Sequence, residues 1–166
     1  MSTPGPTPLP SFNGEGNLPP GDYWPSTAEF EARFVSVPCS VSRPPIYQGF
    51  NRHRAELLAH GVANEAPCLL NGSFTTTKCD PVDIDLVVEV DQSTLLGSQR
   101  LQQLLSGPDA KPQFSCDAYP IIVYEDSHPD YKSVTEDARA YWTKWFGTDR
   151  LGNAKGRVWT NVGGFR

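Results

Sequence analysis

The chain has 166 residues, which is the length of one domain with a single hydrophobic core. Apolar residues make up 38% of it and aromatic residues 11%, which excludes a wholly disordered protein. The net charge of −5 is uneven, because residues 1–131 hold 7 Lys and Arg against 16 Asp and Glu, whereas residues 132–166 hold 7 against 3.

The first 25 residues contain seven of the sixteen prolines. We expect residues 1 to about 12 to be flexible and residues 18–25 to form an extended arm, since proline favours polyproline geometry. Tyr23 and Trp24 are candidates to pin this arm to the body. Residues 26–166 then form a single domain that ends in a basic, Gly-rich tail.

The remaining sequence alternates between helical and strand patterns. Capping boxes at Ser26 and Ser133 start helices, and clean alternation after Asp83 indicates a half-buried strand. Pro120 favours an edge strand or a bulge. The expected elements are, in chain order, a helix over 26–37, a helix over 44–60, a strand over 66–70, a strand over 83–90, a helix over 93–106 with a break near Gly97, a strand over 114–124, a helix over 133–146 and a strand over 157–162. This order predicts an α/β (α+β) fold with a short mixed sheet backed by helices.

Three aspartates stand out in the predicted strands. Asp83 and Asp85 are two residues apart, so their side chains point to the same face, while Ile84 between them points into the core. Asp117 lies in the next predicted strand. Carboxylates grouped in this way suit Mg²⁺ and the chemistry of phosphoryl or nucleotidyl transfer. The alternative is an amphipathic strand with an acidic outer face, although adjacent like charges repel.

A phosphate-binding turn is predicted just before these aspartates. A buried strand leads into Gly72 and Ser73, where glycine allows close approach of a phosphate and serine supplies a hydroxyl. Lys78, in the following polar stretch, is a further candidate to contact a triphosphate. A solvated lysine is the alternative.

These motifs together resemble the signature of polymerase-β-like nucleotidyltransferases, in particular the minimal nucleotidyltransferase group that includes antitoxin partners of HEPN ribonucleases. The signature reads here as Leu70-Asn71-Gly72-Ser73, nine spacer residues, and Asp83-Ile84-Asp85-Leu86. Asn71 departs from it, because the family usually has an apolar residue there. The wider layout is similar to a little-characterised bacterial family of nucleotidyltransferase-like proteins, through Leu18-Pro19-Pro20-Gly21 and Trp145-Phe146-Gly147-Thr148-Asp149-Arg150.

The resemblance implies an enzyme that moves a nucleoside monophosphate from an NTP to a hydroxyl. Gly72 and Ser73 would hold the triphosphate, Asp83 and Asp85 would hold two Mg²⁺ ions, and Asp117 would bind the catalytic metal and activate the acceptor. The acceptor is a protein, an RNA 3′ end or a small molecule, and a toxin–antitoxin or phage-defence setting with a toxin-like partner is implied. The alternative is an inactive nucleotide- or partner-binding module. The NTP and the oligomeric state stay open.

Other residues give weaker indications. The four cysteines fit no zinc pattern and are expected to be reduced thiols. With no apolar stretch of about 18 residues and no secretory signal, we expect a cytoplasmic protein without a membrane partner. The basic segment 149–157 is a candidate clamp for nucleotide, RNA or protein. Arg43 and His53 are expected at the surface, and the aromatic residues of 141–146 in a core or an interface.

Overall fold

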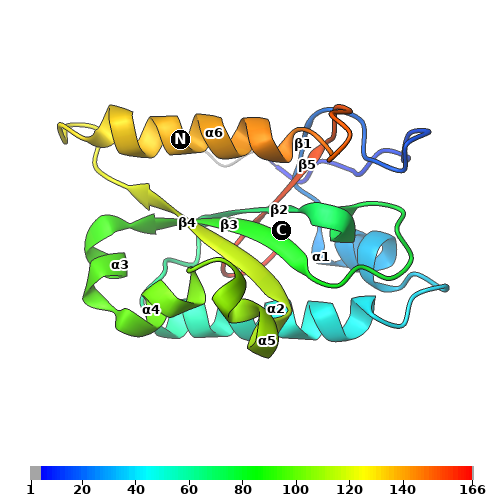
Figure 1. Ribbon diagram of the computed structural model, residues 1–166, viewed down its shortest axis with the longest axis horizontal. Helices are drawn as coiled ribbons and strands as arrows, with labels where there is room; N and C mark the ends of the chain where they lie inside the picture. Colours follow the sequence, from blue (N-terminus) through cyan, green and yellow to red (C-terminus); the bar gives the residue numbers. More distant parts are fainter. Residues whose placement is uncertain (1–4, 166) are drawn as a thin grey trace.

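The computed structural model describes residues 5–165 and shows a mixed sheet between two layers of helices (Figure 1). Helix α6 lies along one face of the sheet, and helices α2, α4 and α5 lie along the other. The elements of the described chain are β1 (Asp22–Tyr23), α1 (Thr27–Phe30), η1 (Glu31–Val35), α2 (Arg43–Ala59), β2 (Pro67–Asn71), η2 (Gly72–Thr75), β3 (Ile84–Asp91), α3 (Gln92–Gly97), α4 (Gln99–Leu104), η3 (Pro108–Ala110), α5 (Lys111–Phe114), β4 (Cys116–Val123), η4 (Tyr131–Glu136), α6 (Asp137–Phe146) and β5 (Arg157–Asn161).

Within residues 5–165, five strands form one sheet in the order β1-β5-β2-β3-β4. Strand β2 is antiparallel to both β3 and β5, whereas β3 and β4 are parallel, as are β1 and β5. The expected mixed α/β fold is thereby confirmed. Pro120 lies in β4, at the edge of the sheet, where its missing N–H costs no ladder bond.

The alternation of β3 divides its side chains between two apolar cores. Ile84, Leu86, Val88 and Val90 face the main core under α2, as their spacing predicts. Val87 points the other way and packs with Leu69, Ile121 and Phe146 beneath α6. Burial on both faces explains why Val87 is apolar, although it lies on the face that also carries Asp85 and Glu89.

The predicted starts of two elements, the strand at residue 114 and the helix at residue 133, differ from the structure. The strand expected from residue 114 begins at Cys116, because residues 111–114 form the short helix α5. The last helical region begins at Tyr131 rather than at a Ser133 cap, and the Ser133 hydroxyl donates to the Asp130 carbonyl instead. The predicted break at Gly97 is confirmed, since α3 ends there.

The N-terminal segment is packed against the body. Leu9 and Leu18 are buried in the main core, and the Leu9 N–H donates to Glu29 Oε1 over 2.6 Å. The prediction of a flexible segment is therefore wrong for residues 7–12, while residues 1–4 lie outside the described part. Tyr23 joins the sheet through β1, and Trp24 stacks on Trp159, so both residues do pin the segment.

A disulfide joins Cys39 to Cys79, so the prediction of four reduced thiols is wrong for this pair. The two cysteines are 40 residues apart, and the fold brings them together through Asp80, whose side chain accepts hydrogen bonds from the segment that follows Cys39. Cys68 and Cys116 are free and buried. No helix among residues 5–165 has the length and apolar character to cross a membrane.

Candidate active site

The structure brings the three predicted aspartates together on the α6 face of the sheet. Asp85 in β3 is the register partner of Asp117 in the parallel strand β4. Asp83 stands one residue before β3, two positions from Asp85, and is only 9% exposed. Two neighbouring parallel strands thus present three carboxylates at the ends where both strands begin.

The turn between α5 and β4 sets this register. Ser115 adopts a left-handed conformation, with φ of 54°, and its carbonyl accepts the Ile84 N–H over 3.0 Å. A non-glycine residue in this region carries backbone strain. The left-handed conformation of Ser115 turns the chain just before Asp117. Gly49 of α2 lies against the Phe114 carbonyl, where a Cβ atom would clash. The lack of a side chain at Gly49 therefore lets α5 pack closely on α2.

Gly72 lies directly against the Asp85 carboxylate. Its φ is 77°, and a Cβ atom at this position would collide with Asp85 Oδ2, so glycine is required for two independent reasons. Asn71, the register partner of Asp85 in β2, fixes the turn. Its side chain accepts the Gly72 N–H over 2.7 Å and donates to the Phe146 carbonyl over 2.5 Å. Asn71, which replaces the apolar residue of the signature, thus links the turn to the end of α6 through its side-chain hydrogen bonds.

Lys155 is a site residue that sequence analysis missed, although the basic segment containing it was a candidate clamp. Its side chain is 4% exposed, and Nζ donates to the Gly72 carbonyl over 2.6 Å. Burial lowers the pKa of Lys155 to about 8, partly offset by the Asp85 and Asp149 carboxylates. A buried ammonium group therefore lies beneath the predicted phosphate-binding turn.

Arg43 organises the segment from Ser73 to Cys79 and is fully buried, contrary to the expected surface position. Its guanidinium donates to the carbonyls of Phe74 over 2.6 Å and Thr76 over 2.8 Å. It also donates to the Lys78 carbonyl over 2.6 Å. The Lys78 side chain itself is exposed and forms no ion pair with any described residue. The spacer is thus a rigid turn with one outward-facing lysine.

The carboxylates repel one another and are held by a further lysine. Burial raises the pKa of Asp85 to about 6, and the charges on Asp83 and Asp117 add to the shift. Lys111, at the start of α5, lies 2.5 Å from Asp83 Oδ2 and 3.8 Å from Asp117 Oδ2. The hydrogen bond to Asp83 raises the pKa of Lys111. No sequence signal marked Lys111, because its role depends on the irregular turn that follows it.

The donor atoms suit a hard divalent cation. Asp117 Oδ1 is buried and has no hydrogen-bond partner among residues 5–165, and carboxylate oxygens are the ligands that Mg²⁺ prefers. Within residues 5–165, no group of three or more acidic, histidine or cysteine side chains is arranged to hold a metal ion. The Lys111 ammonium group supplies positive charge to Asp83 and Asp117 instead. Its side chain is 43% exposed, so it has room to leave.

Residues 10–161 match a family of unknown function, DUF6932. The chain belongs to this family. Neither the search of curated proteins nor that of solved structures found a match. Membership of DUF6932 assigns no activity to the chain.

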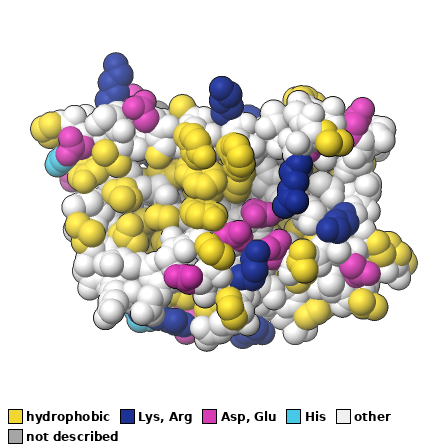
Figure 2. All heavy atoms as spheres, in the orientation of Figure 1, with side chains coloured by type: hydrophobic (Ala, Val, Ile, Leu, Met, Phe, Trp, Pro, Cys, Tyr) yellow, Lys and Arg dark blue, Asp and Glu magenta, His cyan; other side chains and the backbone are white. Residues whose placement is uncertain are grey.

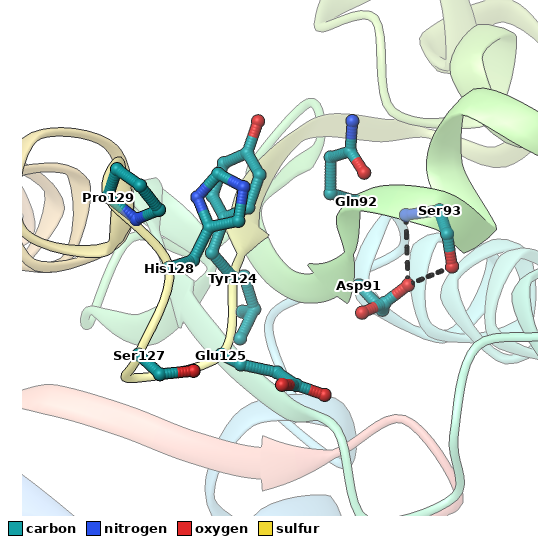
Figure 3. A pocket seen from close by; sticks show the side chains of 9 residues that line it. Asp91, Gln92, Ser93, Tyr124, Glu125, Ser127, His128 and Pro129 are labelled. Carbon is teal, nitrogen blue, oxygen red and sulfur yellow. Dashed lines mark hydrogen bonds between the residues drawn. The ribbon is translucent and has the colours of Figure 1, made fainter.

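The candidate site of this DUF6932 chain lies on an open face of the molecule. Figure 2 shows acidic side chains gathered near the middle of this face, with basic side chains beside them. A cavity of about 350 Å³ lies at the opposite ends of β3 and β4. There Tyr124 stacks on His128, and Asp91 caps α3 through Ser93 (Figure 3). This cavity holds none of the three aspartates.

Proposed function

We propose that this chain is a Mg²⁺-dependent nucleotidyltransferase that moves a nucleoside monophosphate from an NTP to an acceptor hydroxyl. The observation that carries the proposal is the pairing of Asp85 with Asp117 across parallel strands, with Asp83 on the same face and Gly72 against Asp85. A like-charged group of this kind is costly for a fold to keep without a cation to neutralise it.

The transfer involves one bond formed and one bond broken. The acceptor oxygen bonds to the α-phosphorus of the NTP, and the bond from that phosphorus to the oxygen bridging to the β-phosphorus breaks. Pyrophosphate leaves, and the hydroxyl proton passes to a carboxylate, for which Asp117 is the candidate because its Oδ1 is buried with no hydrogen-bond partner in the described part of the chain. The two Mg²⁺ ions, when bound by Asp83, Asp85 and Asp117, would neutralise the charge that develops on the phosphate oxygens.

The phosphate side of the site would be formed by the turn after β2. Gly72 lets the backbone approach the triphosphate, and half-buried Ser73 offers its hydroxyl. The Lys155 ammonium group, which donates to the Gly72 carbonyl, would add positive charge near the bound phosphates. The exposed Lys78 side chain would contact a phosphate from the solvent side. The acceptor is a protein, an RNA 3′ end or a small molecule. A cytoplasmic location, and a toxin–antitoxin or phage-defence role beside a toxin-like partner, remain part of the proposal.

A second function is supported by Lys111. Its ammonium group already neutralises Asp83 and lies within 4 Å of Asp117, as a permanent substitute for a cation would. In that case the chain is a nucleotide- or partner-binding module without turnover. The two functions differ in whether the carboxylates bind metal together with nucleotide.

The experiment that decides between them follows pyrophosphate release from each NTP with Mg²⁺, in the presence of an oligonucleotide or a protein extract. We expect turnover to fall by at least about 100-fold in Asp85→Asn and in Asp117→Asn, since each removes charge from the metal site. Asp130→Asn is the matched control, because Asp130 is exposed and lies in the loop before η4. Equal turnover in all four proteins would refute the enzyme, and no turnover in any would favour the binding module.

A further inference from the structure

Four aromatic side chains form a continuous surface beside the carboxylates, which we call the aromatic shelf: Tyr119 of β4 and Tyr141, Trp142 and Trp145 of α6. The Tyr119 and Trp142 rings are 5.1 Å apart, and Trp142 meets Tyr141 edge-on at 5.2 Å. Tyr141 and Trp145 lie one helical turn apart with their rings parallel to within 7°. These two rings are 57% and 62% exposed, so the outer part of the shelf is open to solvent.

One end of the aromatic shelf lies next to Asp117, the candidate general base. Tyr119 is two residues after Asp117 in the same strand, so both side chains point to the α6 face. The Asp117 carboxylate also adds to the raised pKa of Tyr119, which arises first from burial. Gly72 and Ser73 lie beyond the other side of β3, at the end of β2. The shelf is therefore on the acceptor side of the aspartates, away from the proposed triphosphate turn.

The surroundings of the shelf suit a nucleotide rather than an apolar protein segment. Lys144 follows Tyr141 by three residues on α6, so it lies beside the Tyr141 ring. It is exposed and has no ion pair among residues 5–165. Parallel rings with a free cation one helical turn away match the base and the phosphate of a single-stranded nucleic acid. Figure 2 shows the hydrophobic patch on this face directly beside the acidic side chains.

We propose that the aromatic shelf binds the terminal bases of a single-stranded nucleic acid, whose 3′ hydroxyl is then the acceptor at Asp117. This inference rests on the proposed nucleotidyltransferase function and specifies its acceptor. The 3′ oxygen bonds to the α-phosphorus of the NTP, pyrophosphate leaves, and the proton passes to Asp117. The product is a strand that is one nucleotide longer.

The test measures binding of a fluorescently labelled oligonucleotide by anisotropy, in EDTA and without NTP, in separate RNA and DNA arms. Trp145→Phe keeps a ring, whereas Trp145→Leu keeps only apolar area. We expect Trp145→Leu to weaken binding by about 5- to 150-fold and Trp145→Phe by much less, because base stacking needs a π face. Leu96→Ala is the matched control, since Leu96 is also 62% exposed but lies on α3. Melting curves verify that each exposed-site variant folds.

The outcomes separate this inference from the proposed function. Failure of wild type to bind either oligonucleotide, or equal binding by Trp145→Leu and wild type, overturns the shelf even if NTP is consumed with another acceptor. If no oligonucleotide binds and the protein instead captures another protein that Trp145→Leu also binds, the shelf is an apolar docking surface and the nucleic-acid inference is overturned. If Trp145→Leu loses oligonucleotide binding but no NTP is ever consumed, the shelf stands as a binding site and the transferase fails. The stronger of the RNA and DNA arms identifies the strand.

Discussion

At the scale of single residues, one carboxylate, that of Asp85, lowers the stability of the fold. Asp85 feels the charges of both Asp83 and Asp117, is mostly removed from water, and lies against Gly72. A fold that keeps such a group is less stable than it would be with a neutral side chain of the same shape. Sites that bind charged ligands often show this conflict between stability and function.

Asp85→Asn should therefore stabilise the protein at neutral pH. The folded-state pKa of Asp85 is raised to about 6 from an ordinary 3.8, so the folded chain binds more protons between these values, and wild-type stability is lost as the pH rises through 6. We expect the variant to gain about 1–3 kcal/mol in free energy of unfolding at pH 7.5, and the gain to shrink below pH 6. Urea unfolding at pH 5 and 7.5 measures it, with Asp130→Asn as the control. A variant that is less stable than wild type at pH 7.5 would contradict the assignment.

At the scale of elements, regular patterns were predictable and irregular turns were not. The alternation of residues 83–90 correctly placed Asp83 and Asp85 on one face, and Pro120 correctly indicated an edge strand. Helix α5 was hidden because it is four residues long and contains a proline, so it has no period to detect. Lys111 and the left-handed turn at Ser115 were hidden with it, although they complete the site.

The long-range links around η2 were equally invisible to sequence patterns. Arg43 looks like a solvated helix residue until the fold places the carbonyls of the spacer around its guanidinium. Cys39 and Cys79 have no pairing signal in their spacing, and only the folded chain brings their Cα atoms to 5.8 Å. Both links hold the spacer that connects Gly72 to Asp83.

Reduction of the Cys39–Cys79 disulfide should destabilise the protein without removing the site. The bond closes a loop of 40 residues, and its loss frees the unfolded chain, so we expect the free energy of unfolding to fall by about 2–4 kcal/mol. Urea unfolding with and without a reductant measures the change. The Cys39→Ser variant serves as the control, because its unfolding should not respond to reductant. Identical curves for oxidised and reduced wild type would show that the bond contributes no stability.

At the scale of the whole molecule, the candidate site lies on an open face and has a different structural feature on each side. The turn at Gly72, with Lys155 beneath it, lies on the β2 side, and the aromatic shelf lies on the β4 side. The three aspartates lie between them, on β3, on β4 and one residue before β3. The sequence pattern placed Asp83 and Asp85 on one face, but the positions of Lys155 and of the contact between Tyr119 and Trp142 depend on how the segment before β5 and helix α6 pack in the fold.

The most direct measurement is calorimetric titration of a non-hydrolysable NTP analogue into the protein, with Mg²⁺ and with EDTA. We predict binding that requires Mg²⁺ and that weakens by at least about tenfold in Asp85→Asn, because a metal ligand is lost. Since that variant is expected to be the more stable protein, unfolding does not explain the loss. Binding of equal strength in EDTA and in Mg²⁺, or no binding in either, would contradict the metal–nucleotide site.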